Sequence, residues 1–160
     1  MTPLLLAAFL IAADRPPPVN PQIDYQGFQQ LAARVSPERA KRRVTLTRFN
    51  QMASSGAAII LDARSADAFA QGHIAGAINL PLTDFTAPAL AAAVPDRNRP
   101  ILIYCNNNFA NDRPPVMLKA AAVSLNIQTY INLAAYGYSN VYELGETVDF
   151  DDPKVNWIKG

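Results

Sequence analysis

The sequence contains very little cysteine, with a single residue, Cys105, in a chain of 160. One cysteine cannot form a disulfide within the chain, and it cannot supply a metal site built from several cysteines. Two interpretations of Cys105 remain, a small apolar residue that fills space in the core and a reactive thiol. Because free cysteine is among the most buried residue types, composition alone favours the first interpretation.

The sequence also lacks an excess of charge of either sign. Fourteen Lys and Arg residues face 13 Asp and Glu residues, which leaves a formal net charge of +1. No long-range field therefore attracts nucleic acid or an anionic membrane, and we expect no nucleic-acid partner. The residues indicate no cofactor and no metal site. Asp149, Asp151 and Asp152 could attract calcium, but a solvated acidic turn is the favoured interpretation.

A long apolar run is missing as well. The N-terminal run at residues 1–13 is shorter than the roughly 20 residues that a membrane-spanning helix needs, but it suits the apolar core of a signal peptide. We therefore expect export, with the periplasm as the compartment and no membrane span after signal cleavage. Because no Lys or Arg precedes the run and no small-x-small cleavage site follows, an uncleaved anchor and a wrongly assigned start are alternatives. The next stretch, residues 14–22, is rich in proline and is expected to be an extended linker before a domain at residues 23–160.

The remaining sequence alternates between short apolar runs and helical patterns. The runs at residues 57–62 and 101–104 are typical of strands buried on both faces, and shorter strands are expected at 44–46 and 77–80. Helices are expected at residues 23–35, 66–71 and within 83–94, with one more that Thr47 caps. A basic cluster at residues 39–43 is expected to be a solvated face. This order predicts an α/β fold with a parallel sheet that helices cover on both faces.

Cys105 directly follows the predicted strand at residues 101–104, at the carboxyl edge of the sheet beside Asp62. Ligands of open α/β sheets bind at this edge. The asparagines that follow enter left-handed backbone conformations readily, so the loop can curl and direct its N–H groups at an anion such as a thiolate or persulfide. The loop residues concerned are Asn106, Asn107, Asn108, Phe109, Ala110 and Asn111.

A helix is expected after this loop, with Asp112 as its N-cap, Pro114 and Pro115 in its first turn, and a continuation to Ala122. Its positive end would favour the thiolate of Cys105. This position therefore shifts the preferred interpretation of Cys105 to a reactive thiol. We expect the thiol to be recessed and protected by residues 106–127.

Four other polar residues are candidates for the site. Arg64 and Arg113 could bind an anionic substrate, although salt bridges to Asp62 or Asp112 are the favoured alternative. Asp62 is expected to have a structural role. His73, the only histidine, lies between glycines at a helix-to-strand turn, where a bond from its ring to a backbone carbonyl is favoured over a role as a base.

Three segments resemble the rhodanese-like domain family. Residues 61–81 (LDARSADAFAQGHIAGAINLP) are similar to its first motif, residues 101–105 (ILIYC) to the strand that delivers its sulfur-carrying cysteine, and residues 136–144 (YGYSNVYEL) to its final strand. The resemblance spans about residues 44–144. It implies a five-stranded parallel sheet and a thiolate at Cys105 that takes sulfur as a persulfide and passes it to a nucleophile.

The chain departs from the family pattern in three places. The five residues after Cys105 contain neither the glycine nor the arginine that is usual in sulfur-transferring members. More residues lie between Cys105 and Gly137 than the family's single loop and helix need, so residues 125–135 are expected to form a second helix. The C-terminal residues after 148 are expected to be an irregular tail.

The favoured function is that of a sulfurtransferase or persulfide carrier, in which Cys105 attacks a sulfane sulfur. The loop amides of residues 106–110 would stabilise the anion, while Arg113 and Arg64 would position a small sulfur-containing anion such as thiosulfate; a thiol is the expected acceptor. A thiol-based phosphatase would need an arginine where Asn111 stands. A non-catalytic binding or redox-sensing module on the same fold is the main alternative, and the sequence does not indicate the oligomeric state.

Overall fold

The computed structural model describes residues 19–160. The apolar run at residues 1–13, with its predicted role in export, and the first part of the linker lie outside the described residues. Within residues 19–160, no helix is both long enough and apolar enough to cross a membrane.

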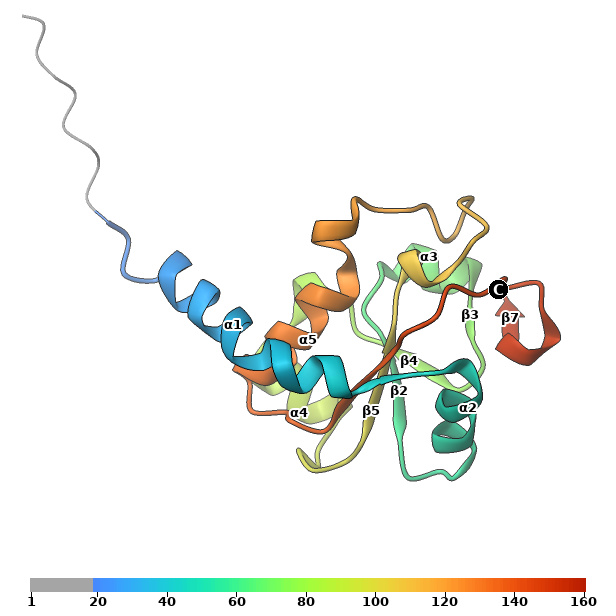
Figure 1. Cartoon of the computed structure of the whole chain (residues 1–160), viewed down its shortest axis with the longest axis horizontal. Helices are drawn as coiled ribbons and strands as arrows, with labels where there is room; N and C mark the ends of the chain where they lie inside the picture. The colour runs from blue at the N-terminus through green and yellow to red at the C-terminus, as the bar shows by residue number, and fades with distance from the viewer. Residues whose placement is uncertain (1–18) are drawn as a thin grey trace, which may run out of the picture.

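Five parallel strands form the central sheet, as the sequence predicts (Figure 1). Their order across the sheet is β1-β6-β5-β2-β4. The two long apolar runs become the central neighbours β2 and β5, in which Asp62 pairs with Tyr104. The bounds are β1 Arg43–Val44, β2 Ile59–Asp62, β4 Ala77–Asn79, β5 Ile101–Tyr104 and β6 Val141–Leu144.

Helices cover both faces of this sheet. On one face Leu90 of α4 and Leu133 of α5 pack with Ile101 and Ile103 in one apolar cluster. On the other face Phe49 of α2 packs with Leu102 in a second cluster. The helices are α1 Tyr25–Lys41, α2 Leu46–Ser54, α3 Ala66–Gln71, α4 Ala87–Ala93 and α5 Leu125–Ala135, and the short 3₁₀ helices are η1 Leu82–Asp84, η2 Asn106–Asn108, η3 Ala121–Val123 and η4 Pro153–Val155.

The first helix differs from the prediction in both length and exposure. We expected it to end at Val35, before Pro37, but α1 continues to Lys41 because its last turn is held by tertiary contacts, including a bond from Arg39 to Glu143 of β6. Ile23 and Phe28 are exposed, so the part of the helix that packs on the core is near Val35. Figure 1 shows the N-terminal half of α1 extending away from the sheet.

The start of the second helix was also predicted two residues too late. The side chain of Thr45, not Thr47, accepts a hydrogen bond from the backbone N–H of Arg48 at 3.2 Å and caps α2. The strand β1 ends accordingly at Val44. Both threonines precede apolar residues at helical spacing, so the sequence pattern alone does not distinguish them.

The C-terminal residues are not an irregular tail, which corrects the prediction. The strand β7 (Trp157–Lys159) pairs antiparallel with β3 (Gly72–Ile74), a segment that we expected to be a turn. Trp157 stacks on Phe150 with ring centroids 5.2 Å apart and meets Phe109 edge-on at 5.1 Å. Strands of three residues are too short to produce a recognisable alternation, so this pairing could not be predicted from the pattern.

Trp157 should therefore stabilise the fold although it comes near the end of the chain. We expect Trp157→Ala to lower the free energy of unfolding by roughly 3 kcal/mol, because it removes the aromatic contacts that cover Phe109. Ile158→Ala, on the same strand but with an exposed side chain, should cost less than about 0.5 kcal/mol. Urea unfolding of the two variants would measure both values, and equal losses would show that the cluster does not depend on Trp157.

Candidate functional site

Cys105 directly follows β5 at the carboxyl edge of the sheet, as the sequence predicts, one residue beyond Tyr104, which pairs with Asp62 of β2. The exposed fraction of Cys105 is 1%. The expectation of a recessed thiol is confirmed. Cys105 is therefore buried, yet it occupies the sheet edge at which α/β proteins bind ligands.

The loop after Cys105 has a different conformation from the one predicted. Asn106, Asn107 and Asn108 form the 3₁₀ helix η2, and within residues 19–160 the only non-glycine residues with positive φ are Asp112 and Asn156. The amides of Asn108, Phe109 and Ala110 donate to the carbonyls of Cys105, Asn106 and Val148 at 3.0, 3.0 and 2.9 Å. Most of the expected nest is thus already bonded to carbonyl oxygens and is not open to an anion.

Backbone amides do act on the thiol of Cys105, but they come from two segments. They belong to Asn107 in η2 and to Leu125 and Asn126 in the first turn of α5, and they lower the pKa of Cys105. Burial acts in the opposite direction and is the largest effect, and the negative charge of Glu143 adds to it, so the pKa of Cys105 is raised overall. The structure therefore holds a protonated thiol beside groups that would stabilise an anion.

The helix expected from Asp112 to Ala122 is absent. Residues 112–120 form an irregular segment, η3 follows, and α5 begins at Leu125, at the predicted bound of the second helix. A proline restricts the residue before it to extended conformations, so Pro115 keeps Pro114 out of the helical region. Asp112 adopts a φ of 36° and accepts a hydrogen bond from the Leu118 amide at 3.0 Å. It therefore organises a loop instead of capping a helix.

Asn108 connects the loop to the rest of the site. Its Oδ1 accepts hydrogen bonds from the backbone N–H of Cys105 and from Nδ2 of Asn126, both at 2.9 Å. Its Nδ2 donates to the carbonyls of Leu144 and Glu146 at 2.7 and 3.1 Å. The buried side chain thus fixes Cys105 relative to both β6 and α5.

Asp62 and Arg64 form a buried ion pair, the favoured alternative in the sequence analysis. Nη2 of Arg64 lies 2.6 Å from Oδ2 of Asp62, and Nε of Arg64 lies 3.0 Å from both carboxylate oxygens. Nη2 also donates to the carbonyl of Gly72, while the hydroxyl of Tyr104 donates to Asp62. His73 bonds through Nδ1 to the carbonyl of Phe69 at 2.9 Å, as expected for a structural residue.

Other predicted site residues attach the loop to the C-terminal segment. Arg113 pairs with Asp151 at 2.6 Å, and both side chains are about half exposed. Asn111 donates to Asp149 at 2.7 Å and accepts from the Phe150 amide at 3.1 Å. Phe109 is fully buried in the aromatic cluster with Trp157. None of these side chains is directed at the sulfur.

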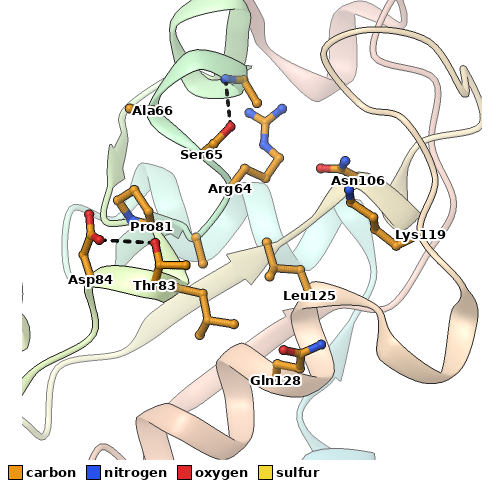
Figure 2. Close-up of a pocket in the computed structure, with 13 residues that line it drawn as sticks. Arg64, Ser65, Ala66, Pro81, Thr83, Asp84, Asn106, Lys119, Leu125 and Gln128 are labelled. Carbon is orange, nitrogen blue, oxygen red and sulfur yellow. Dashed lines mark hydrogen bonds between the residues drawn. The ribbon is translucent and has the colours of Figure 1, made fainter.

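Two cavities flank the loop. The larger, of about 570 Å³, lies between α3, η1 and α5, and Figure 2 shows Arg64, Asn106, Lys119 and Gln128 around it. The smaller, of about 180 Å³, is the one that Cys105 lines. Arg113 lines neither. The walls of the smaller cavity also include Arg39, Arg43, Asn107, Asn108, Ser124, Asn126, Glu143, Glu146 and Thr147.

Most residues of this smaller cavity were not predicted to belong to the site, and three of them, Arg39, Asn126 and Glu143, interact with one another. Nη2 of Arg39 bonds Oε1 of Glu143 at 2.7 Å, and Nδ2 of Asn126 lies 3.3 Å from the same oxygen. The sequence did offer a signal for Glu143. In the strand VYEL it comes two residues after the buried Val141, so it lies on the same face of the strand as that residue. Arg39 belongs to the cluster expected to be a solvated face, and only the tertiary fold reveals its partner.

Residues 45–146 match the model of the rhodanese-like domain. The chain belongs to the rhodanese-like domain family. Its membership agrees with the five-stranded parallel sheet and with the three sequence segments that resemble the family. Arg39 and Arg43 precede the matched residues, so the smaller cavity of this rhodanese-like domain is partly built from outside the family core.

The rhodanese-like domain is also similar to individual proteins. It is 30% identical over 95 residues to the thiosulfate sulfurtransferase PspE of Escherichia coli strain K12. The aligned residues cover 59% of this chain and 76% of that protein. Among solved structures, a rhodanese from E. coli with anions is 28% identical and covers 65% of this chain and 100% of its own, with a TM-score of 0.45. The BH2092 protein from Bacillus halodurans is 19% identical. The match covers 74% of this chain and 77% of that one with a TM-score of 0.50, and it supports the fold alone.

The two Arg–Asp pairs next to the loop should differ strongly in their effect on stability. Arg64→Met leaves the carboxylate of Asp62 buried without its partner, so we expect a loss of about 3–5 kcal/mol in the free energy of unfolding. Arg113→Met removes an exposed pair and should cost less than about 1 kcal/mol. Chemical denaturation of both variants measures the difference. Similar losses would contradict the structural role assigned to Arg64.

Proposed function

We propose that this rhodanese-like domain is a sulfurtransferase or persulfide carrier in which Cys105 accepts the sulfur atom. The observation that carries this proposal is the position of Cys105 at the carboxyl edge of the sheet, where it lines a cavity together with Asn107 and Asn126. The amides of Asn107, Leu125 and Asn126 lower the pKa of its thiol, although burial raises that pKa more. The similarity to a protein named as a thiosulfate sulfurtransferase supports the same reaction class. The acceptor is a nucleophile such as a thiol.

The proposed reaction has two steps. In the first, the Cys105 thiolate attacks the sulfane sulfur of a donor; a new S–S bond forms, and the donor's bond to that sulfur breaks with its electron pair on the leaving group. In the second, the acceptor attacks the outer sulfur of the Cys105 persulfide and releases the thiolate. The three amides would stabilise the negative charge of the thiolate and of the persulfide anion.

A second candidate function is a binding or redox-sensing module without catalysis. The observation that favours it is the 1% exposure of Cys105 together with its raised pKa, because such a thiol is a weak nucleophile at neutral pH. Neither Arg64 nor Arg113 offers a free guanidinium group to a substrate at this sulfur, which also favours this candidate. The two functions differ in whether sulfur is transferred to Cys105.

The proposed compartment is the periplasm, on the basis of the apolar run at residues 1–13 and the proline-rich residues that follow. In that location a lone thiol would meet oxidants. The burial of Cys105 would then protect it from oxidation between reactions.

Sulfur transfer can be tested by intact-mass analysis of the reduced protein after brief exposure to thiosulfate or to a hydropersulfide. We expect one added sulfur on the wild type that cyanide or excess thiol removes, and no addition to Cys105→Ser, because Cys105 is the only thiol. An unmodified wild type with both donors would reject the carrier function and leave the binding module.

The pH dependence of thiol alkylation tests the electrostatics of the site. Burial raises the pKa of Cys105, so the reactive thiolate is the minor form at neutral pH and increases as the pH rises. We expect the rate with iodoacetamide to increase about tenfold per pH unit between about pH 6 and pH 8, without a plateau. A plateau below about pH 7.5 would show that the amides outweigh burial and that the pKa is lowered.

A further inference from the structure

Three residues that line the small cavity beside Cys105 each carry a buried polar atom without a hydrogen-bond partner among the described residues. The atoms are Nε of Arg39, Oδ1 of Asn126 and Oε2 of Glu143. The exposed fractions of Asn126 and Glu143 are only 3% and 6%. Leaving buried acceptors unpaired costs free energy, so the oxygens of Asn126 and Glu143 indicate a ligand that supplies hydrogen-bond donors, whereas Nε of Arg39 is itself a donor.

The charges around the cavity do not favour a dianion next to the sulfur. Two arginines and two glutamates line it, but Arg39 already bonds Oε1 of Glu143 at 2.7 Å, and Arg43 and Glu146 are exposed residues, whose charges water screens. The guanidinium of Arg39 and the carboxylate of Glu143 each keep one unpaired atom, but the carboxylate is the more deeply buried, with 8% of its side chain exposed against 26% for Arg39. Burial is the main cause of the raised pKa of Cys105, and the charge of Glu143 raises it further.

We propose that this cavity is the donor site and that Glu143 and Asn126 select a small, uncharged hydropersulfide that donates hydrogen bonds, in preference to the thiosulfate dianion. The selection rests on the proposed sulfur-transfer function. The Cys105 thiolate attacks the outer sulfur of R–S–SH, the donor S–S bond breaks, and the products are Cys105–S–SH and the thiolate RS⁻. Charge and sulfur atoms are conserved, and no oxidant is needed.

Two alkylating agents of nearly equal shape test the charge preference directly. Iodoacetamide is neutral and carries N–H donors, whereas iodoacetate is an anion. We expect the rate ratio of iodoacetamide to iodoacetate at Cys105 to exceed the ratio for 2-mercaptoethanol by roughly tenfold, because the anion meets the carboxylate of Glu143. A ratio equal to that of 2-mercaptoethanol would overturn the proposal.

Glu143→Gln provides the matched variant, since it keeps the shape of the side chain and removes its charge. In this variant the ratio of the iodoacetamide rate to the iodoacetate rate at Cys105 should fall by roughly tenfold, toward the ratio for 2-mercaptoethanol. Glu38→Gln removes a charge from the exposed surface of α1, where Glu38 pairs with Arg42, and should leave the ratio unchanged. An unchanged ratio in a folded Glu143→Gln protein would overturn the proposal; if that variant does not fold, the wild-type ratio decides.

Sulfur loading of the wild type separates this inference from the proposed function. We expect an uncharged alkyl hydropersulfide to load Cys105 at least about tenfold faster than thiosulfate, after each rate is divided by that of 2-mercaptoethanol with the same donor. If thiosulfate loads as fast or faster on this scale, the donor preference is wrong while the carrier function stands. If neither donor loads Cys105, both are wrong.

Discussion

The side chain of Asn108 holds the site together. Its four hydrogen bonds join the backbone of Cys105, the end of β6 and the first turn of α5. Because Asn126 is one of those partners, the same interaction sets the distance between the sulfur and the amides of α5. A chain that lacks the usual glycine and arginine in its loop thus positions its cysteine through a buried amide side chain.

The electrostatics of Cys105 result from three opposing contributions. Burial and the carboxylate of Glu143 favour the thiol, whereas the amides of Asn107, Leu125 and Asn126 favour the thiolate. The thiol prevails in the free protein. A ligand that donates hydrogen bonds to Glu143 would reduce the negative potential at the sulfur, so donor binding and activation of the nucleophile would be coupled.

The sequence predicts the elements whose pattern is local and strong. The bounds of β5, α3 and α5 agree with the predictions, because apolar runs and helical periodicity within a few residues determine them. The pairing of β3 with β7 and the irregular segment at residues 112–120 depend on contacts between distant residues and on the effect of one proline on another. These features have no local pattern that distinguishes them from the alternatives.

The same distinction applies to the site. Cys105 and the Asp62–Arg64 pair follow from strand ends that the sequence marks clearly, whereas Arg39 and Glu143 are 104 residues apart and meet only in the folded chain. The loop shows why. Ala110 donates to the carbonyl of Val148, and Phe109 packs on Trp157, so the C-terminal segment, rather than a loop arginine, fixes the far end of the loop. This leaves the smaller cavity to be closed by α1 and β6, which places a carboxylate beside the nucleophile and makes the charge of the donor the property that the site can discriminate.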